Sequence, residues 1–258
     1  MESIYRINDN LYKLVHKTYD DDLFGAKVYE LLESKNELGL TINSAEDLSK
    51  DLNKLSFCTF RGAYNLKVIH FLEDNNFRFV DDFLHLRLKK KEYNPFKISS
   101  TKNVTKVLGR PSDNIIKDLV DLEKSVHDFS TFQADYRIEN NISAERNAIR
   151  VKSYFNNPNH LIYLHIDPKS KEINGFHQCV KGVNHVLFTN TAVKKINQSF
   201  DLVGLKLFAA AHEDIFKDSD INFIDSGCGF NNKSSLRLHL GFNYSIYNRE
   251  IHFRKIKN

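Results

Sequence analysis

Hydrophobic and polar residues follow two different periods along this chain, and the two periods alternate. The clearest succession lies in the last third of the sequence. Residues 186–193 form a β-rich apolar run that predicts a strand, and Leu202, Leu205 and Phe208 then recur at helical spacing. A second short strand is predicted over residues 221–225. This succession of strand, helix and strand predicts one unit of an α/β fold.

The residues after the second predicted strand change from apolar to small and polar. Residues 226–229 contain two glycines and are expected to end the strand, because glycine weakens strand pairing. Asn231 or Asn232 is placed to cap a short helix that ends at Gly241. A final hairpin is predicted around Asn248.

The first third of the chain repeats this mixture of periods on a smaller scale. An acidic turn is expected over residues 19–25. A helix is expected to begin after Asn43 or Ser44, with acidic residues in its first turn, where carboxylates favour the helix dipole. The other predicted elements are strands over residues 26–32 and 55–60, a helix over residues 63–75, and a long strand or hairpin arm over residues 77–88.

A run of lysines from Lys89 to Lys91, followed by Pro95, marks a boundary. Like-charge repulsion and proline both disfavour regular structure, so residues 94–103 are expected to form a linker. The sequence therefore predicts an N-terminal domain over residues 1–93 and a C-terminal domain over residues 104–258. The same lysines are compatible with an anionic membrane or a nucleic acid, to which each would contribute about 1 kcal/mol.

The predicted C-terminal domain opens with a strand and two helices. The strand covers residues 104–108, and the helices cover residues 115–122 and 143–155, the second of them begun by Ser143. Three strands follow over residues 161–166, 173–180 and 185–193. Short polar turns join these strands, which predicts an antiparallel meander.

Composition indicates a globular protein with an ordinary surface. The chain has 258 residues, of which 41% are hydrophobic and 12% aromatic, enough to bury a substantial core. Its net charge of +4 comes from interleaved basic and acidic residues, which favours a solvated surface over a nucleic-acid interface. Cys58, Cys179 and Cys228 are far apart, as expected of reduced thiols rather than a disulfide framework or zinc site. The N-terminus is polar and no apolar run reaches the roughly 18 residues of a membrane span, so we expect a cytoplasmic protein.

A short motif near the C-terminus carries a family resemblance. It consists of Asn232, then Leu236 and Leu238 with His239 directly after, and finally Leu240-Gly241-Phe242. This pattern resembles the GNAT superfamily of acyl-CoA-dependent N-acyltransferases, with His239 where that family often has a tyrosine and two residues fewer before Leu-Gly-Phe. The resemblance implies a mixed α/β fold, with a mostly antiparallel sheet flanked by helices. It also implies acetyl-CoA as the acyl donor and no metal.

The resemblance implies where the acyl donor binds. In the family a strand end precedes a phosphate-binding turn, which here lies within residues 198–204 and contains one glycine, Gly204. Phosphates bind such turns through backbone N–H groups and the positive end of a helix, so few glycines do not abolish the site. Asn232 either contacts the donor or only caps its helix. The implied donor-binding residues are Thr191, Ala192, Val193, Gln198, Ser199, Leu202, Val203, Gly204 and Asn232.

The same resemblance suggests which residues act on the substrate. His239 is the candidate acid for the leaving thiolate, and its alternative role is a surface contact on a half-exposed helix. His177 is the candidate base, alone or through water, and its alternative is a strand histidine with a backbone partner. Asn190 and Asp225 lie at predicted strand ends, where they either reach the substrate or cap a turn.

The N-terminal region carries a second resemblance. Asp22-Leu23-Phe24-Gly25, and later Phe71-Leu72-Glu73 with Phe77, are similar to the N-terminal half of TDP-fucosamine acetyltransferases and their relatives. Those enzymes place a reduced GNAT-like half before a complete one and acetylate the amino group of a nucleotide-linked 4-amino-6-deoxy sugar. The resemblance implies an amino-sugar nucleotide of surface-polysaccharide biosynthesis as substrate. It also implies that Tyr136 and Arg137, in a polar and aromatic loop, face the sugar.

Two other function classes stay open at this point. One is a GNAT-fold module that binds a sugar or a partner without catalysis, which the glycine-poor phosphate turn favours. The other is an acyltransferase with a different donor or a peptide-type acceptor. A small-molecule substrate is the expected partner, with no nucleic acid and no membrane span, and the choice between monomer and homodimer is left open.

Overall fold

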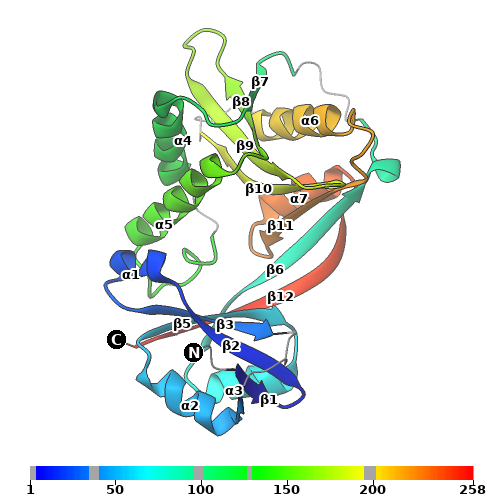
Figure 1. The fold of residues 1–258 in the computed structure, drawn as a ribbon. Coiled ribbons are helices and arrows are strands. Elements are labelled where there is room, and N and C mark those ends of the chain that lie inside the picture. The colour runs from blue at the N-terminus through cyan, green and yellow to red at the C-terminus, as the bar shows by residue number, and fades with distance from the viewer. Residues whose placement is uncertain (1–3, 35–40, 96–100, 127–129, 195–201, 258) are drawn as a thin grey trace. The chain divides into compact units, whose positions relative to one another are not determined.

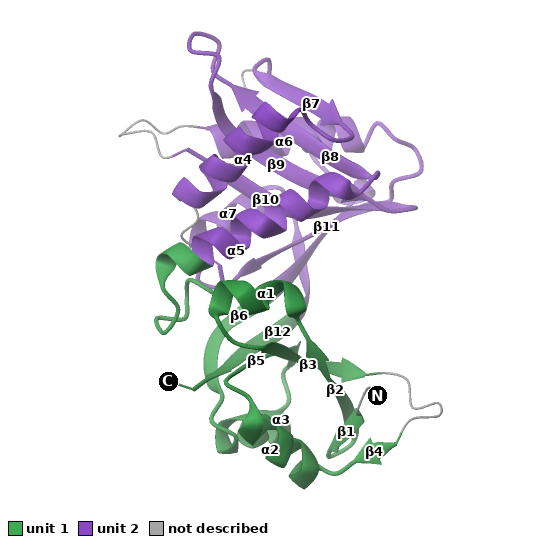
Figure 2. Ribbon diagram, turned by 60° about the vertical axis from the view of Figure 1, so that its left-hand side comes forward, with its two compact units in different colours: residues 1–83, 131–142, 249–258 green, residues 84–130, 143–248 purple. Residues whose placement is uncertain are grey.

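A computed structural model of the chain describes residues 4–34, 41–95, 101–126, 130–194 and 202–257 (Figure 1). The chain folds into two compact units, shown in different colours in Figure 2. The first unit comprises residues 1–83, 131–142 and 249–258, and the second comprises residues 84–130 and 143–248. The division into domains at residues 94–103 stays a prediction.

The first unit is built on a sheet with the strand order β4-β1-β2-β3-β5-β12-β6. Strands β1 and β2, β2 and β3, and β5 and β12 pair antiparallel, whereas β3 and β5 pair in parallel. Strands β6 and β12 each continue into the second unit. The strands span β1 Ile4–Ile7, β2 Asn10–His16, β3 Val28–Ser34, β4 Ile42–Asn43, β5 Phe57–Ala63, β6 Arg78–Lys89 and β12 Ser245–Ile256.

Helices α2 (Ala45–Lys54) and α3 (Leu66–Asp74) supply much of the core of the first unit. Each buries two residues four positions apart, which lie on one face of the helix. Helix α2 begins after Ser44, as predicted, and α3 begins after Asn65, whose side chain accepts hydrogen bonds from the first turn. The buried residues of this core include Leu31, Leu48, Leu52, Phe60, Val68, Leu72 and Phe253.

The predicted acidic turn over residues 19–25 is wrong, because Thr18–Phe24 form helix α1. Asp20 and Asp21 stand in its first turn, where negative charge is favoured by the helix dipole. Gly25 then ends the helix in the left-handed conformation, with φ at 61°. The acidic run therefore starts a short helix instead of replacing it.

The predicted final hairpin around Asn248 is also wrong. Ser245–Ile256 form one continuous strand, β12, which pairs with β5 from Glu250 to Ile256. The sharp turn lies earlier, at Asn243, whose φ is 65°. Asparagine tolerates this left-handed conformation, and the chain has already turned before the strand begins.

The second unit has the strand order β12-β6-β11-β10-β9-β8-β7. Strands β7 to β10 are antiparallel neighbours, so the predicted meander is confirmed, and β10 pairs with β11 in parallel. Most of the strand pairs are thus antiparallel, as predicted. The new strands span β7 Val104–Leu108, β8 His160–Ile166, β9 Ile173–Lys181, β10 His185–Val193 and β11 Phe223–Gly229.

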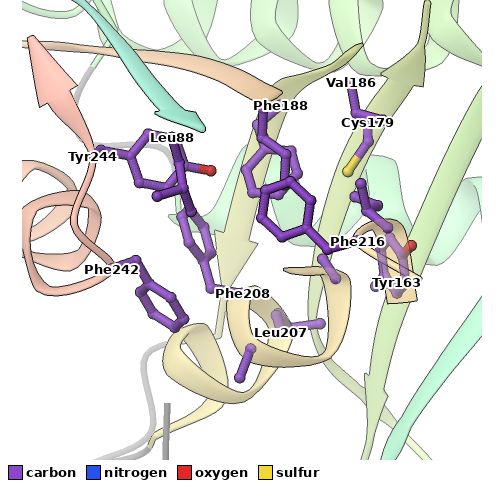
Figure 3. Close-up of a cluster of buried hydrophobic side chains, with 14 of the residues drawn as sticks. Leu88, Tyr163, Cys179, Val186, Phe188, Leu207, Phe208, Phe216, Phe242 and Tyr244 are labelled. Carbon is purple, nitrogen blue, oxygen red and sulfur yellow. The ribbon is translucent and has the colours of Figure 1, made fainter. Parts of the chain in front are cut away.

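Two hydrophobic clusters lie on opposite faces of this sheet. Helices α4 (Asp113–Val126) and α5 (Asn140–Ser153) cover one cluster, which contains Ile162, Phe176 and Ala192. Helix α6 (Val203–Ile215) and helix α7 (Lys233–Gly241) border the other, where Phe188, Phe208, Phe242 and Tyr244 meet (Figure 3). Helix α5 starts three residues before Ser143, which is buried inside it, so the predicted cap at Ser143 is wrong.

Strand β11 continues through the residues that were expected to break it. Ile224, Ser226 and Cys228 are buried at alternate positions, so these residues face the core with the period of a strand. Cys58, Cys179 and Cys228 are all free and buried thiols. Gly227 and Gly229 are accommodated inside strand β11.

Candidate functional site

The parallel strands β10 and β11 part before either of them ends. They pair over three positions only, from His185 opposite Phe223 to Leu187 opposite Asp225. Strand β10 runs on to Val193 and β11 to Gly229, and these later residues, all of them described, do not pair with each other. The backbone groups that face the gap are therefore available to a ligand that lies between the two strands.

A β-bulge at Thr189 adds one residue to β10 at the point where the gap begins. Even-numbered residues after the bulge therefore point to the opposite side of the sheet from even-numbered residues before it. The register with β9 shifts between Phe188 and Asn190, and the Thr189 hydroxyl donates to the carbonyl of Gln178 at 3.1 Å. Before the bulge Phe188 faces α6, whereas after it Ala192 faces the α4–α5 side, although both residues have even numbers. The extra residue therefore sets which side chains border the gap.

Helix α6 is the next element after β10 in the part of the chain that the structure describes. Leu202 occupies the N-cap without a side-chain hydrogen bond, and no acidic residue stands in the first turn. Among the described residues, a Cβ atom on Gly204 would meet Val193 alone, at 3.7 Å. The first N–H groups of a helix and its dipole attract negative charge, so phosphate is suited to this position. Gln198 and Ser199, which were predicted to take part, lie outside the described residues.

Close packing holds α6 against the sheet. A Cβ atom on Gly175 of β9 would lie 2.7 Å from Cγ1 of Val203 and 3.1 Å from Cδ1 of Leu207. Only glycine allows the helix to approach this closely. Val203 is itself fully buried, so the first turn of α6 is fixed in place beside the end of β10.

His239 is buried, with 2% of its surface exposed, so the alternative of a surface contact is wrong. Its Nδ1 lies 2.7 Å from the carbonyl oxygen of Ser235, which can only accept, so Nδ1 carries the proton. Its Nε2 is then the acceptor of the Ser226 hydroxyl at 2.6 Å. Burial lowers the pKa of His239 to about 4, and the ring is neutral at pH 7.

His177 lies on β9 beneath α6 and is also buried. Its Nδ1 is 2.7 Å from the hydroxyl of Thr191, and its Nε2 has no hydrogen-bond partner. Burial, with the nearby rings of His212 and His239, lowers its pKa well below the ordinary value. Its role as a base stays a prediction, and the structure connects it to Thr191, one of the predicted donor-binding residues.

Asn232 caps α7, since its side chain accepts a hydrogen bond from the backbone N–H of Ser235 at 3.0 Å. This is the structural alternative that was considered for it. The cap fixes the start of the helix that carries His239, so it also bears on the position of that ring. A further contact of Asn232 with a donor stays a prediction.

Asn190 and Asp225 are both held by charged partners in the second unit. Asn190 donates to the carboxylate of Glu123 at 2.8 Å, and Asp225 accepts two hydrogen bonds from Arg87, at 2.6 and 2.8 Å. The Arg87 guanidinium also lies 4.0 Å from the ring of Phe223. Such a bidentate pair is strongly oriented, so Asp225 has a structural partner in this arrangement.

Arg87 lines a cavity of about 480 Å³ in the second unit. Its other lining residues are Lys89, Lys90, Lys91, Asn222 and Phe223. Lys90 is held in place by the backbone carbonyl of Asp218, to which it donates at 2.8 Å. The lining is mainly basic and aromatic, which suits an anionic group.

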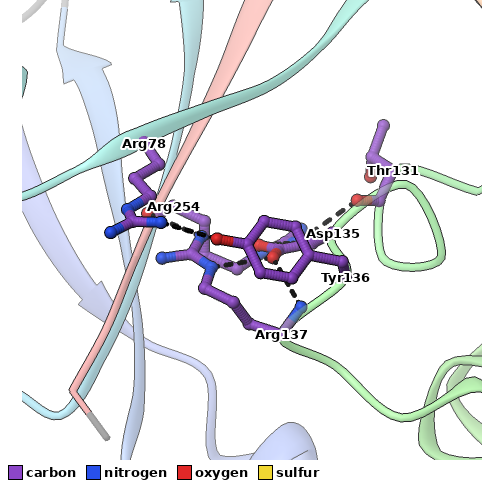
Figure 4. A network of polar contacts seen from close by, with 6 residues as sticks. All are labelled: Arg78, Thr131, Asp135, Tyr136, Arg137 and Arg254. Atoms are coloured by element: carbon purple, nitrogen blue, oxygen red, sulfur yellow. Dashed lines mark hydrogen bonds and ion pairs between the residues drawn. The ribbon is translucent and has the colours of Figure 1, made fainter.

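Tyr136 and Arg137 belong to the first unit, unlike the other predicted site residues. Arg137 binds the carboxylate of Asp135, which also binds Arg254 at 3.0 Å (Figure 4). Burial raises the pKa of Asp135, but the two guanidinium groups outweigh it and hold that pKa below its ordinary value. Tyr136 is 79% exposed, and its hydroxyl accepts from Arg78 at 2.6 Å.

The sequence-based interpretation missed Ser226 and the bulge at Thr189. Ser226 was placed in a segment expected to break the strand. The alternation of Ile224, Ser226 and Cys228 is the signal that identifies it, because three residues of one face recur at strand spacing. Within the described ranges no three metal-ligating side chains cluster, and no helix is long and apolar enough to cross a membrane.

Comparison with known proteins gives a match in structure. No family model and no curated protein sequence matches this chain. A GCN5-related N-acetyltransferase from Sphaerobacter thermophilus is similar with a TM-score of 0.61 at 10% identity, covering 95% of this chain and 76% of that chain. A tandem GNAT protein from the clavulanic acid biosynthesis pathway has a TM-score of 0.60 at 11% identity, covering 95% and 78%. A GCN5-related N-acetyltransferase from Kribbella flavida has a TM-score of 0.58 at 8% identity, covering 100% and 90%.

These similarities establish the fold. The chain has the GNAT fold, and the similarity extends over most of its length and includes a tandem GNAT protein. The predicted mixed α/β class, with its mostly antiparallel sheet and flanking helices, is thus confirmed. The likeness to TDP-fucosamine acetyltransferases in particular stays a prediction.

Proposed function

We propose that this protein is an N-acyltransferase that moves an acetyl or other short acyl group from acyl-CoA to the amine of a small substrate. The observation that carries the proposal is the gap between β10 and β11, which opens beside the N-terminus of α6, where no described side chain caps the helix. The similar structures from Sphaerobacter and Kribbella are GCN5-related N-acetyltransferases, which supports the same class of reaction here.

The residues around the gap are suited to an extended acyl-CoA. Unpaired backbone groups of β10, up to Thr191, Ala192 and Val193, can pair with the amides of pantetheine. The first turn of α6, at Val203 and Gly204, can bind the pyrophosphate through its N–H groups. A long donor would thus lie along the strand end with its phosphates at the helix.

The chemistry requires a neutral amine and a stabilised carbonyl oxygen. An acyl-CoA supplies a thioester whose carbonyl carbon is open to attack by the amine. A backbone N–H of β10 near Ala192 or Val193 would stabilise the oxygen as negative charge develops on it. The proton that leaves the amine needs an acceptor, and the leaving thiolate needs a donor.

For the acceptor we propose a nucleotide-linked amino sugar of surface-polysaccharide biosynthesis. The motifs of the N-terminal region support it, and so does the basic cavity at Arg87 and Lys89 to Lys91, which is suited to phosphate. Phe223 of that cavity lies three residues before Ser226, a separation of about 10 Å along a strand. Tyr136 and Arg137 are further candidates for contacts with the sugar.

Titration of the purified protein with acetyl-CoA, and then with CoA, tests the proposal. We expect micromolar binding of both, followed by an acetylated product when amino-sugar nucleotides are added and product masses are measured. Folded protein that gives neither heat nor a thermal shift with acetyl-CoA would contradict the proposal and favour a binding module. Binding without transfer to any amino sugar would favour a different acyl donor or a peptide-type acceptor.

A further inference from the structure

Ser226 and His239 form a hydrogen-bonded pair with a defined direction. The carbonyl of Ser235 holds the proton of Nδ1, so Nε2 presents a lone pair and the Ser226 hydroxyl donates to it at 2.6 Å. A neutral His239 in this arrangement has no proton to give to a substrate. It is instead placed to accept the proton of Ser226, and the ring is oriented by a third group, as in activated hydroxyl sites.

The pair lies at the opening between the strands. Asp225 is the last residue of β11 that pairs with β10, and Ser226 is the first residue after it. Both residues are buried, with 6% of Ser226 and 2% of His239 exposed, and Ser226 is the member that lies on the strand bordering the gap. The position is therefore next to the place where a thioester would lie.

Two aromatic rings pack against His239. The rings of Phe208 and Tyr244 stand edge-on to it, each with its centroid 5.0 Å away. These rings give the imidazole an apolar surrounding, in which a proton placed on Nε2 is passed back readily. The oxygen of Ser226 keeps its lone pairs for a group in the gap.

We propose that Ser226 carries the proton of the acyl transfer, from the attacking amine to the leaving thiolate, and that His239 holds it in between. This inference rests on the proposed acyltransferase function and names the residues that handle its proton. Ser226 is the catalytic residue because it touches the substrate. His239 acts through Ser226 and is not the direct acid that the sequence predicted.

The transfer balances without any other reactant. As the amine nitrogen bonds to the thioester carbon, its proton moves to Oγ of Ser226, and the Ser226 proton moves to Nε2 of His239. When the carbon–sulfur bond breaks, the sulfur takes the electron pair and receives a proton from Ser226, while Nε2 returns its proton to Oγ. The products are an amide and a thiol, and the pair ends as it began.

Substitution of Ser226 tests this assignment. We compare Ser226→Ala, which removes the hydroxyl, with Ser226→Thr, which restores one. Cys228→Ala is the matched control, because Cys228 is also a small buried residue on the same face of β11, two positions further on. For each protein we measure acetyl-CoA binding by calorimetry and release of CoA, with a nucleotide-linked 4-amino-6-deoxy sugar or with water as acceptor.

We expect the substitution of Ser226 by alanine to lower turnover and to leave acetyl-CoA binding nearly unchanged. Ser226→Ala should lower kcat at least 100-fold, the usual contribution of acid–base catalysis, while its Kd for acetyl-CoA stays within threefold of the wild type. Ser226→Thr should have a kcat at least tenfold higher than that of Ser226→Ala. The kcat of Cys228→Ala should stay within threefold of the wild type. Equal losses in Ser226→Ala and Cys228→Ala would assign the effect to packing and overturn the proposal.

The other outcomes separate this inference from the proposed function. Wild-type turnover that survives in Ser226→Ala within threefold overturns the role of Ser226 and leaves the acyltransferase function in place. Wild-type protein that binds acetyl-CoA but releases no CoA to either acceptor overturns the role of Ser226 in transfer from acetyl-CoA to an amino sugar, and it leaves the donor site in place. Absence of acetyl-CoA binding by folded wild-type protein overturns the acyltransferase function itself, and the role of Ser226 with it.

Discussion

Each unit contains two parallel strands that are joined through a helix. The two pairs of strands differ in the number of positions over which they pair. In the first unit β3 and β5 pair over five positions, from Val28 opposite Phe57 to Leu32 opposite Arg61. In the second unit β10 and β11 pair over three positions and then separate. The same arrangement is thus closed in one unit and open in the other.

The helices that connect the strands of each pair also differ, in how their N-termini are capped. Helix α2 of the first unit starts with a capping box, in which Ser44 and Asp47 satisfy each other's backbone N–H groups, and Glu46 adds negative charge. Helix α6 of the second unit starts without a side-chain cap and without acidic residues in its first turn. A capped, acidic helix start repels an anion, whereas an uncapped one attracts it. The comparison therefore supports the proposal that the acyl donor binds in the second unit.

The largest expected difference between the units is their response to acid. Four histidines with pKa values lowered by burial, His160, His177, His212 and His239, lie in the second unit. For His160 the folded pKa is about 4, against an ordinary value of 6.5. Its neutral form stabilises the fold fully above about pH 6.5. That contribution is lost as pH falls toward 4, at about 1.4 kcal/mol per histidine per pH unit.

Hydrogen exchange at pH 7 and pH 5, corrected for intrinsic rates, measures this difference. We expect amides of β8 and α6 to lose protection before those of β2 and β3. His160→Phe is the informative variant, because neither ring nitrogen of His160 has a hydrogen-bond partner and the ring packs on Tyr154 and Phe155. The free energy of unfolding of this variant should depend less on pH, because the contribution of one histidine has been removed. Simultaneous opening of both units at every pH would contradict the prediction.

Packing at Gly175 gives the next largest effect. Gly175→Ala places a methyl group against Val203 and Leu207, so α6 must shift away from β9, at a cost of about 2 kcal/mol. Acetyl-CoA binding should weaken with it, because the first turn of α6 moves. Gly204→Ala is the control, since its methyl group meets only Val193 at an ordinary distance. Urea unfolding measures both variants, and an equal loss in both would show that the close approach is unimportant.

The sequence predicts the elements of the open pair well, because periodicity is a local property. The helix after Leu202 and the strand over residues 186–193 are found where apolar residues recur at the expected spacing. The fold class follows from the order of such elements, and Asn232 caps α7 as its position before the helix indicates. These features depend on residues that are close in sequence.

The features that make the pair open depend on residues far apart in sequence. The bulge at Thr189 is a shift of register against β9, and no residue type in β10 signals it. Asp225 pairs with Arg87, which is 138 residues away, so its partner cannot be read from its neighbours. Ser226 was missed because two glycines beside it favoured a break, whereas burial against α7 keeps the segment extended.

A charge at the start of α6 should have a smaller effect than these changes in packing. Gly204→Asp places a carboxylate beside the proposed pyrophosphate position, and we expect the Kd for acetyl-CoA to rise about tenfold, or about 1.4 kcal/mol. Calorimetry measures this change, with Gly204→Ala as the uncharged control. The effect should shrink at high salt, because repulsion between exposed charges is screened. Unchanged affinity in Gly204→Asp would place the phosphates elsewhere.

The smallest expected effect comes from the capped helix of the first unit. Ser44→Ala removes the hydroxyl that accepts from the backbone N–H of Asp47 at 3.2 Å, which should lower stability by about 1 kcal/mol. Acetyl-CoA affinity should stay the same, because the proposed donor site does not include α2. Ser44→Gly should cost less, since glycine is tolerated at an N-cap. Chemical denaturation with parallel calorimetry checks both quantities, and weaker acetyl-CoA binding in Ser44→Ala would show that the closed pair contributes to the donor site.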